Sequence, residues 1–159
     1  MGTRRPAGGT AMPEWIAWGI FAAHSGLLVS DEMFYHRRRI LKRWERIGHP
    51  LDTLTFLLPA GLTLLFDPTG TARTVYIVLA VISSLFITKD EWQHHALCPA
   101  AEQWLHAVLF VIHPVTLWML FQLWTGGGHI LQYVFVIAAA GMFLHQLIYW
   151  NVIREAPAG

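Results

Sequence analysis

Five apolar stretches, each close to the length of a membrane-crossing helix, constrain this chain more than any other feature. A helix needs roughly 20 apolar residues to cross the hydrocarbon core of a bilayer. The stretches lie at about 14–30, 50–66, 74–88, 100–124 and 130–153. Turn-forming residues separate several of them, as at Asp67-Pro68-Thr69-Gly70. The sequence therefore predicts an all-α, polytopic membrane protein of about five transmembrane helices.

The composition agrees with a membrane protein of one domain. Hydrophobic residues make up 55% of the 159 residues and charged residues only 13%, so lipid must cover much of the surface. We expect a flexible N-terminal tail over 1–12 and a single transmembrane domain over 13–155. An N-terminal signal peptide is the alternative for the first stretch, but that stretch is long for one and runs directly into polar residues.

Basic residues are unevenly distributed between the turns, which predicts the orientation. The turn after the first stretch contains six of them: Arg37, Arg38, Arg39, Lys42, Arg43 and Arg46. The turns on the other side contain only Arg73. Because short cytoplasmic loops are rich in Lys and Arg, we expect the first turn to be cytoplasmic and the N-terminus to be outside. The bilayer is the expected partner, with a hydrophobic small molecule in addition, and no nucleic acid is expected.

A polar signature occurs twice, at the two turns predicted to be cytoplasmic. The first copy has DEMFYH at 31–36 and ERIGH at 45–49, and the second has DEWQHH at 90–95 and EQWLH at 102–106. Both copies follow the pattern Asp-Glu-x-x-x-His, a short connection, and Glu-x-x-x-His. Four of the six glutamates in the chain take part, and only Glu14 and Glu155 do not. The repeats at about 14–66 and 73–123 thus predict two similar helical hairpins.

These hairpins are expected to form a four-helix bundle around a pseudo-twofold axis, with the span at about 129–152 as a fifth helix. Residues four apart lie on the same face of an α-helix, so each Glu and His would point the same way. Carboxylates and neutral imidazoles together suit transition-metal ions. The predicted ligands are Glu32, His36, Glu45, His49, Glu91, His95, Glu102 and His106.

The pattern resembles the di-iron carboxylate proteins built on four-helix bundles, where inward glutamates combine with Glu-x-x-His motifs. Here the Glu-to-His spacing is one residue longer and occurs four times instead of twice, so ligand roles cannot be transferred position by position. The resemblance implies two or more metal ions, with iron favoured; manganese, zinc and copper also suit these ligands. A lone cysteine, Cys98, excludes sulfur-rich metal sites. Haem is disfavoured because it gives no reason for a Glu four residues before each His.

Further polar residues near the signature are candidates for additional ligands or for groups that hydrogen bond to the ligands. These are Asp31, Asp52, Asp90, His113 and His145. For His113 a buried, hydrogen-bonded histidine is the favoured interpretation. Tyr35 and His94 occupy corresponding positions in the two copies and are candidates for proton or electron transfer. We expect His24 to be a packing residue and His129 to be solvated.

The leading functional hypothesis is an oxygen-dependent di-metal oxidoreductase that acts on a hydrophobic membrane substrate. A protein that transports, binds or senses metal ions without catalysis is the alternative. The polar residues could also form ordinary salt bridges in two cytoplasmic loops. That interpretation suits the Arg-rich first copy better than the second, where Lys89 is the nearby cation.

Overall fold

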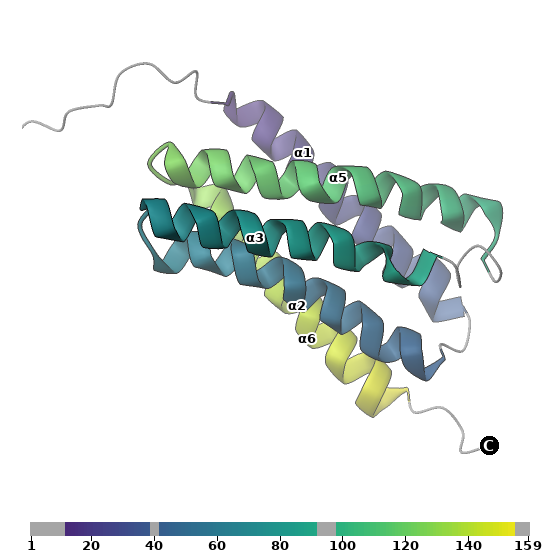
Figure 1. Ribbon diagram of the computed structural model, residues 1–159. Helices are drawn as coiled ribbons and strands as arrows, with labels where there is room; N and C mark the ends of the chain where they lie inside the picture. Colours follow the sequence, from purple (N-terminus) through teal and green to yellow (C-terminus); the bar gives the residue numbers. More distant parts are fainter. Residues whose placement is uncertain (1–11, 39–41, 92–97, 155–159) are drawn as a thin grey trace, which may run out of the picture.

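The computed structural model describes residues 12–38, 42–91 and 98–154 of the chain (Figure 1). These residues form an all-α bundle of five main helices. They are α1 (Glu14–Ser30), α2 (Arg43–Leu65), α3 (Gly70–Phe86), α5 (Ala100–Thr125) and α6 (Ile130–Ile148). A π-helical turn (Asp31–Tyr35) and a 3-10 turn (His36–Arg38) follow α1, a 3-10 turn (Ile87–Asp90) follows α3, and a second π-helical turn (Tyr149–Ile153) follows α6.

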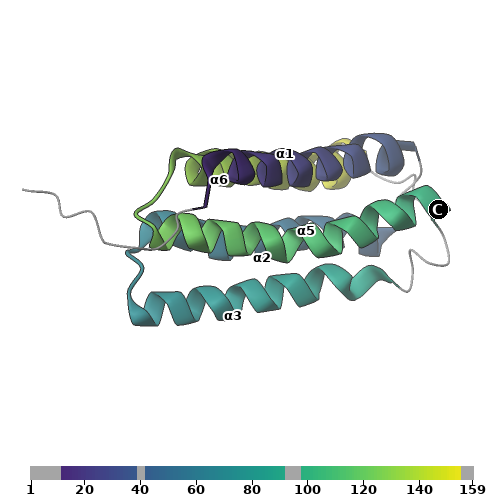
Figure 2. The ribbon, with the colours of Figure 1, turned by 90° about the horizontal axis from the view of Figure 1, so that it is seen from above.

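The helices are arranged with α2 and α5 in the middle. Helix α3 lies on one side of this pair, and α1 and α6 lie on the other (Figures 1 and 2). Helix α1 packs mainly on α5, and α2 packs on both α3 and α6. Helix α6 therefore packs mainly on α2, although it directly follows α5 in the sequence.

The turn between α5 and α6 depends on backbone conformations that glycine adopts readily. Gly127 and Gly128 have φ angles of 110° and 83°, in the left-handed region. His129 then caps α6, because its Nδ1 accepts a hydrogen bond from the Leu131 N–H at 3.1 Å. The Gln132 side chain completes the cap by accepting the His129 N–H at 2.7 Å. His129 is thus a structural residue at this turn as well as a partly solvated one.

The bundle interior is small and the bundle surface is apolar. The core cluster contains Ala17, Phe56, Ala60, Leu117, Met119, Leu120, Leu131 and Phe135. Many large apolar side chains point outward instead, such as Leu85, which is 68% exposed, and Ile137, which is 71% exposed. An apolar surface of this extent suits contact with lipid better than contact with water.

By length and composition, three of the described helices could cross a membrane. They extend over Gly70–Lys89, Ala100–Thr125 and Ile130–Ile153. The sequence predicts about five such helices, but α1 and α2 do not reach the same apolar length. Helix α1 is bounded by Glu14 and by Asp31, and the first turns of α2 contain Arg43, Glu45 and Arg46. The polar residues of the first repeat copy therefore shorten the apolar part of these two helices.

A buried hydrogen bond between α3 and α5 provides a test of this packing. The Tyr76 hydroxyl donates to the Leu117 carbonyl at 2.6 Å, and the side chain is buried. We expect Tyr76→Phe to lower the free energy of unfolding in detergent by about 1 kcal/mol, because one buried hydrogen bond is lost. Tyr133→Phe, at an exposed position on α6, is the control and should leave stability unchanged. Equal stability of the two variants would contradict this contact.

Candidate metal centre

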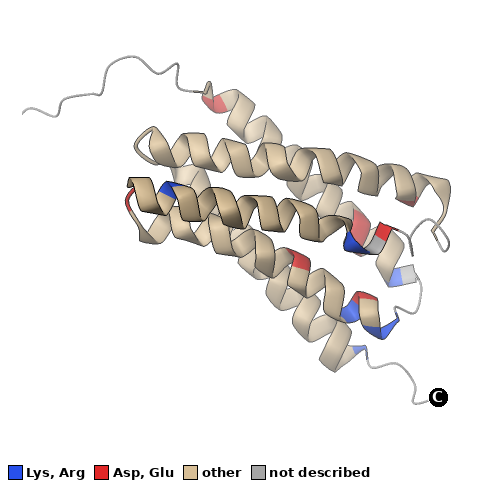
Figure 3. Ribbon diagram, viewed as in Figure 1, with Lys and Arg blue, Asp and Glu red and all other residues tan. Residues whose placement is uncertain are grey.

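Charged residues concentrate at one end of the bundle (Figure 3). This end contains the two turns after α1, the start of α2, the end of α3 and the start of α5. The opposite end has few charged residues, including Asp67 and Arg73. The segments of both repeat copies that the structure describes therefore lie at the same end of the molecule.

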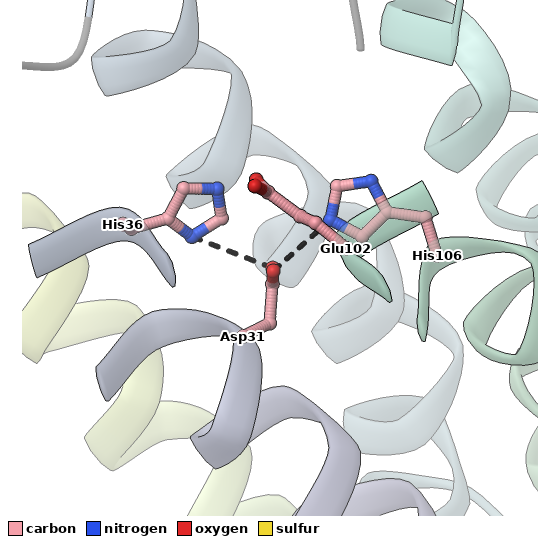
Figure 4. A group of neighbouring side chains, drawn as sticks. All are labelled: Asp31, His36, Glu102 and His106. Atoms are coloured by element: carbon pink, nitrogen blue, oxygen red, sulfur yellow. Dashed lines mark hydrogen bonds and ion pairs between the residues drawn. The ribbon is translucent and has the colours of Figure 1, made fainter. Parts of the chain in front are cut away.

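Four buried side chains at this end form a group that could hold a metal ion. They are Asp31 and His36 from the turns after α1, and Glu102 and His106 from the first two turns of α5. Each offers one nitrogen or oxygen atom, and these four atoms lie within 4.8 Å of one another. Figure 4 shows the Asp31 and Glu102 carboxylates lying between the two imidazole rings. Two carboxylates and two imidazoles thus converge on one point.

The distances in this group fit a metal site. The Nε2 atom of His106 lies 3.0 Å from Oδ1 of Asp31, and Nδ1 of His36 lies 3.4 Å from its Oδ2. For metal–ligand bonds of about 2.1 Å, neighbouring ligand atoms lie about 3.0 Å apart in an octahedron and about 3.4 Å apart in a tetrahedron. Nitrogen and carboxylate oxygen ligands suit iron, manganese, zinc or copper. The donor set therefore suits a transition-metal ion, and these two distances match those between neighbouring ligands.

The π-helical turn after α1 explains why Asp31 belongs to the group. The His36 N–H bonds to the Asp31 carbonyl, five residues back instead of four. This wider turn aligns residue 36 with residue 31. The α-helical spacing expected from the sequence would instead pair His36 with Glu32. The Asp31 carboxylate consequently lies 3.4 Å from Nδ1 of His36. π-Helical turns often occur at functional sites.

Glu102 and His106 have the regular α-helical spacing of four residues that was predicted from the sequence. Pro99 precedes α5 in an extended conformation, and Glu102 lies in the first helical turn. A carboxylate is favourable there because the N-terminus of a helix carries partial positive charge. His106 lies one turn later on the same face, and both side chains are buried.

Glu32 is buried but points toward α6. Its carboxylate accepts hydrogen bonds from the Trp150 indole N–H and, at 3.4 Å, from the Gln146 amide. Nε2 of His145 lies 3.5 Å from the same carboxylate. Burial raises the pKa of the Glu32 carboxyl above its ordinary value, although these hydrogen bonds favour the charged form. Two of the sequence candidates, Glu32 and His145, therefore contact each other outside the four-residue group.

Glu45 and His49 lie on α2 beside the group. Glu45 is buried, and its Oε2 accepts the Lys42 N–H at 3.0 Å, which caps α2. The His49 ring lies 4.3 Å from the His36 ring, centroid to centroid. His49 and Asp31 also line a cavity of about 60 Å³. His49 is thus adjacent to the group, and Glu45 lies one helical turn before His49 on α2.

The remaining candidates have different surroundings. Asp52 forms an ion pair with Lys89, whose Nζ lies 2.7 Å from both carboxylate oxygens. His113 contacts the Ser83 hydroxyl at 2.9 Å, deeper in the bundle. Glu91 is exposed and Tyr35 is half-buried. His94, His95 and the side chain of Asp90 lie outside the described residues.

Sequence reasoning missed two features of this region. The first is the pairing of Asp31 with His36, because the sequence indicated Asp31 only as an additional ligand or a hydrogen-bonding group. The sequence contains a signal for this pairing, since an Asp stands five residues before a His in both repeat copies. The second is the contact of Trp150 and Gln146 with Glu32. No sequence pattern connects residues so far apart, although a Trp at the polar end of an apolar helix indicates an interface position.

No protein-family model matches the chain, and no curated protein or solved structure matches it either. The interpretation of the site therefore depends on its own geometry. A buried set of two carboxylates and two imidazoles, with a small cavity beside it, can bind a metal ion and leave space for another molecule.

The π-helical register can be tested by comparing two neighbouring carboxylates. We expect Asp31→Asn to reduce metal retention about tenfold or more, because it removes a charged ligand between two imidazoles. Glu32→Gln should retain metal, because its carboxylate faces Trp150. Elemental analysis of the purified variants measures both, with the exposed Glu14→Gln as control. Loss of metal in Glu32→Gln together with retention in Asp31→Asn would contradict the assignment.

Proposed function

We propose that this protein is a membrane metalloenzyme, an oxidoreductase that acts on a hydrophobic substrate at a dinuclear transition-metal centre near the cytoplasmic face. The observation that carries the proposal is the burial of Asp31, His36, Glu102 and His106 around one point at the polar end of an apolar bundle. Ionisable groups in such surroundings are costly and are retained where they have a function. A bound cation would offset the charge of the carboxylates.

The proposed arrangement in the membrane has five crossings. Besides the three helices that are apolar enough by themselves, α1 and α2 would cross as well. Their outward side chains support this, because Trp15, Leu58 and Leu65 are all exposed. In this arrangement the six basic residues over 37–46, which include the start of α2, would put the metal group on the cytoplasmic side and the N-terminus outside.

The proposed pseudo-twofold axis relates the hairpin α1–α2 to the hairpin α3–α5. Exchange of the two hairpins would convert the α1–α5 contact into the α3–α2 contact. Both of these contacts are extensive. The doubled sequence signature and this packing pattern together support an internal repeat, with α6 as an additional helix packed on α2.

A second metal ion would bind beside the first. Glu45 and His49 are the described candidates for its ligands, since the His49 ring is next to His36 and Glu45 lies buried one helical turn before His49. The sequence adds Glu91 and His95 of the second copy. The resemblance to the di-iron carboxylate proteins favours iron, and iron when bound would supply the capacity to react with oxygen. The chain itself would hold the ions, bury them and restrict the access of water.

Metal analysis of anaerobically purified protein tests the proposal. We expect about two iron ions per chain, as in dinuclear carboxylate sites, and an optical absorption that changes when oxygen is added. Glu102→Gln should lose both the metal and the absorption change, while Glu14→Gln should retain both. Tightly bound metal without any response to oxygen would favour a binding or transport protein. The proposal would be excluded if wild-type protein that has not been exposed to a chelator contains no tightly bound transition metal.

The orientation can be tested with single cysteines in a Cys98→Ser background. Asp67 lies in the exposed turn between α2 and α3, and Arg43 is exposed at the start of α2. We expect a membrane-impermeant maleimide to label Asp67→Cys in intact cells, and Arg43→Cys only after permeabilisation. The reverse pattern would place the metal group on the outer face.

A further inference from the structure

A second cavity lies deeper in the bundle than the metal group. Its volume is about 110 Å³, and its lining includes His24, His113, Phe56, Phe135 and Met142. Apart from a few polar groups the walls are apolar. The cavity adjoins the smaller one beside the metal group, because Leu28, Asp52, Thr53 and Ile87 line both.

The packing of α1 on α5 fixes the depth of this cavity relative to the metal group. Asp31 contacts His106, and His24, seven residues earlier, lies beside His113, seven residues later on α5. Seven residues of α-helix correspond to about 10 Å. The antiparallel pair thus carries two polar layers about 10 Å apart, one at the polar end and one among apolar side chains.

His24 is buried with no hydrogen bond from its ring to any other described residue. The side chain is 1% exposed, and both ring nitrogens are buried. Its neighbours are the aromatic rings of Phe56 at 5.5 Å and Phe135 at 5.8 Å, and the His113 ring at 5.6 Å. His113 differs, because the Ser83 hydroxyl contacts it. A neutral imidazole has one donor and one acceptor, and burying both unused is costly unless a bound molecule meets them.

The cavity is partly open, and the exposed residues of its lining are on α1 and α6. Val29 on α1 is 45% exposed, and Ala138 on α6 is also exposed. The small side chains of Ser25, Ala138 and Ala139, on the same two helices, also line the cavity. This opening lies on the apolar surface, so a molecule dissolved in the bilayer could enter sideways without passing through water.

We propose that this cavity binds the hydroxyl-bearing end of a lipophilic alcohol or phenol, hydrogen bonded to His24, with its apolar part extending between α1 and α6. At about 110 Å³ the cavity is smaller than the apolar cavity of about 150 Å³ that is known to accommodate benzene, but it is partly open, so one small ring can lie within it and extend into the opening. A hydroxyl can either donate to or accept from an imidazole, so it can meet one of the two unused ring nitrogens in either tautomer. That this molecule is also the substrate rests on the proposed function, whereas its binding to the cavity does not require metal.

A pair of isosteric probes tests the hydrogen bond to His24. In wild-type full-length protein in lipid nanodiscs, 4-propylphenol should bind about tenfold more tightly than 4-propyltoluene, which has a methyl group in place of the hydroxyl. His24→Phe should bind both probes equally, and His24→Gln should restore a preference for the phenol. Equal affinities in the wild-type protein, unchanged preference in His24→Phe, or no saturable binding of either probe would overturn the proposal.

A spectroscopic measurement keeps the test valid if His24→Phe does not fold. In wild-type protein labelled with 15N-histidine, the His24 ring signals should shift on addition of 4-propylphenol and stay in place with 4-propyltoluene. Unshifted signals at saturation would overturn the proposal, because the bound phenol would then make no hydrogen bond to His24. Phenol binding that persists in Asp31→Asn, after loss of metal, would separate this site from the metal centre.

Discussion

The burial of ionisable groups in an apolar bundle is the constraint on which the rest of this structure depends. Asp31 lies between the imidazoles of His36 and His106, and Glu102 lies on the other side of the same point. None of these groups would be stable there alone, because charge without a partner is very costly away from water. Their mutual contacts, and the cation that we propose, allow an otherwise apolar molecule to carry a polar centre.

This polar centre determines which helices are apolar along their whole length. Helices α3, α5 and α6 are long and apolar enough to cross a bilayer, whereas α1 and α2 give up part of their length to charged residues. The C-terminal part of α6 and the π-helical turn after it also contact the polar end, because Gln146 and Trp150 donate hydrogen bonds to Glu32. The last helix therefore closes the polar end, in addition to packing along α2.

The all-α fold and much of the site were predictable from the sequence, because apolar length and the spacing of four residues reflect local helix geometry. Glu102 and His106 are on a regular helix, so their spacing placed them correctly on one face. The π-helical turn at 31–35 could not be predicted, since its wider spacing depends on contacts made by the folded bundle. The orientation of Glu32 toward Trp150 is likewise a tertiary contact between distant residues. The sequence predicted His24 to be a packing residue. The cavity beside His24 is lined by four of the main helices, so it could not be predicted from local sequence.

The constant spacing along the α1–α5 contact has a mechanical consequence. Because Asp31 with His106 and His24 with His113 belong to the same antiparallel pair, one sliding coordinate between the two helices governs both layers. A rigid-body slide of α1 along α5 that displaced His24 from His113 would displace Asp31 from His106 by the same distance. The two polar layers are therefore mechanically coupled through the helices themselves. A rigid-body shift at one layer is transmitted to the other without any intervening chain of hydrogen bonds.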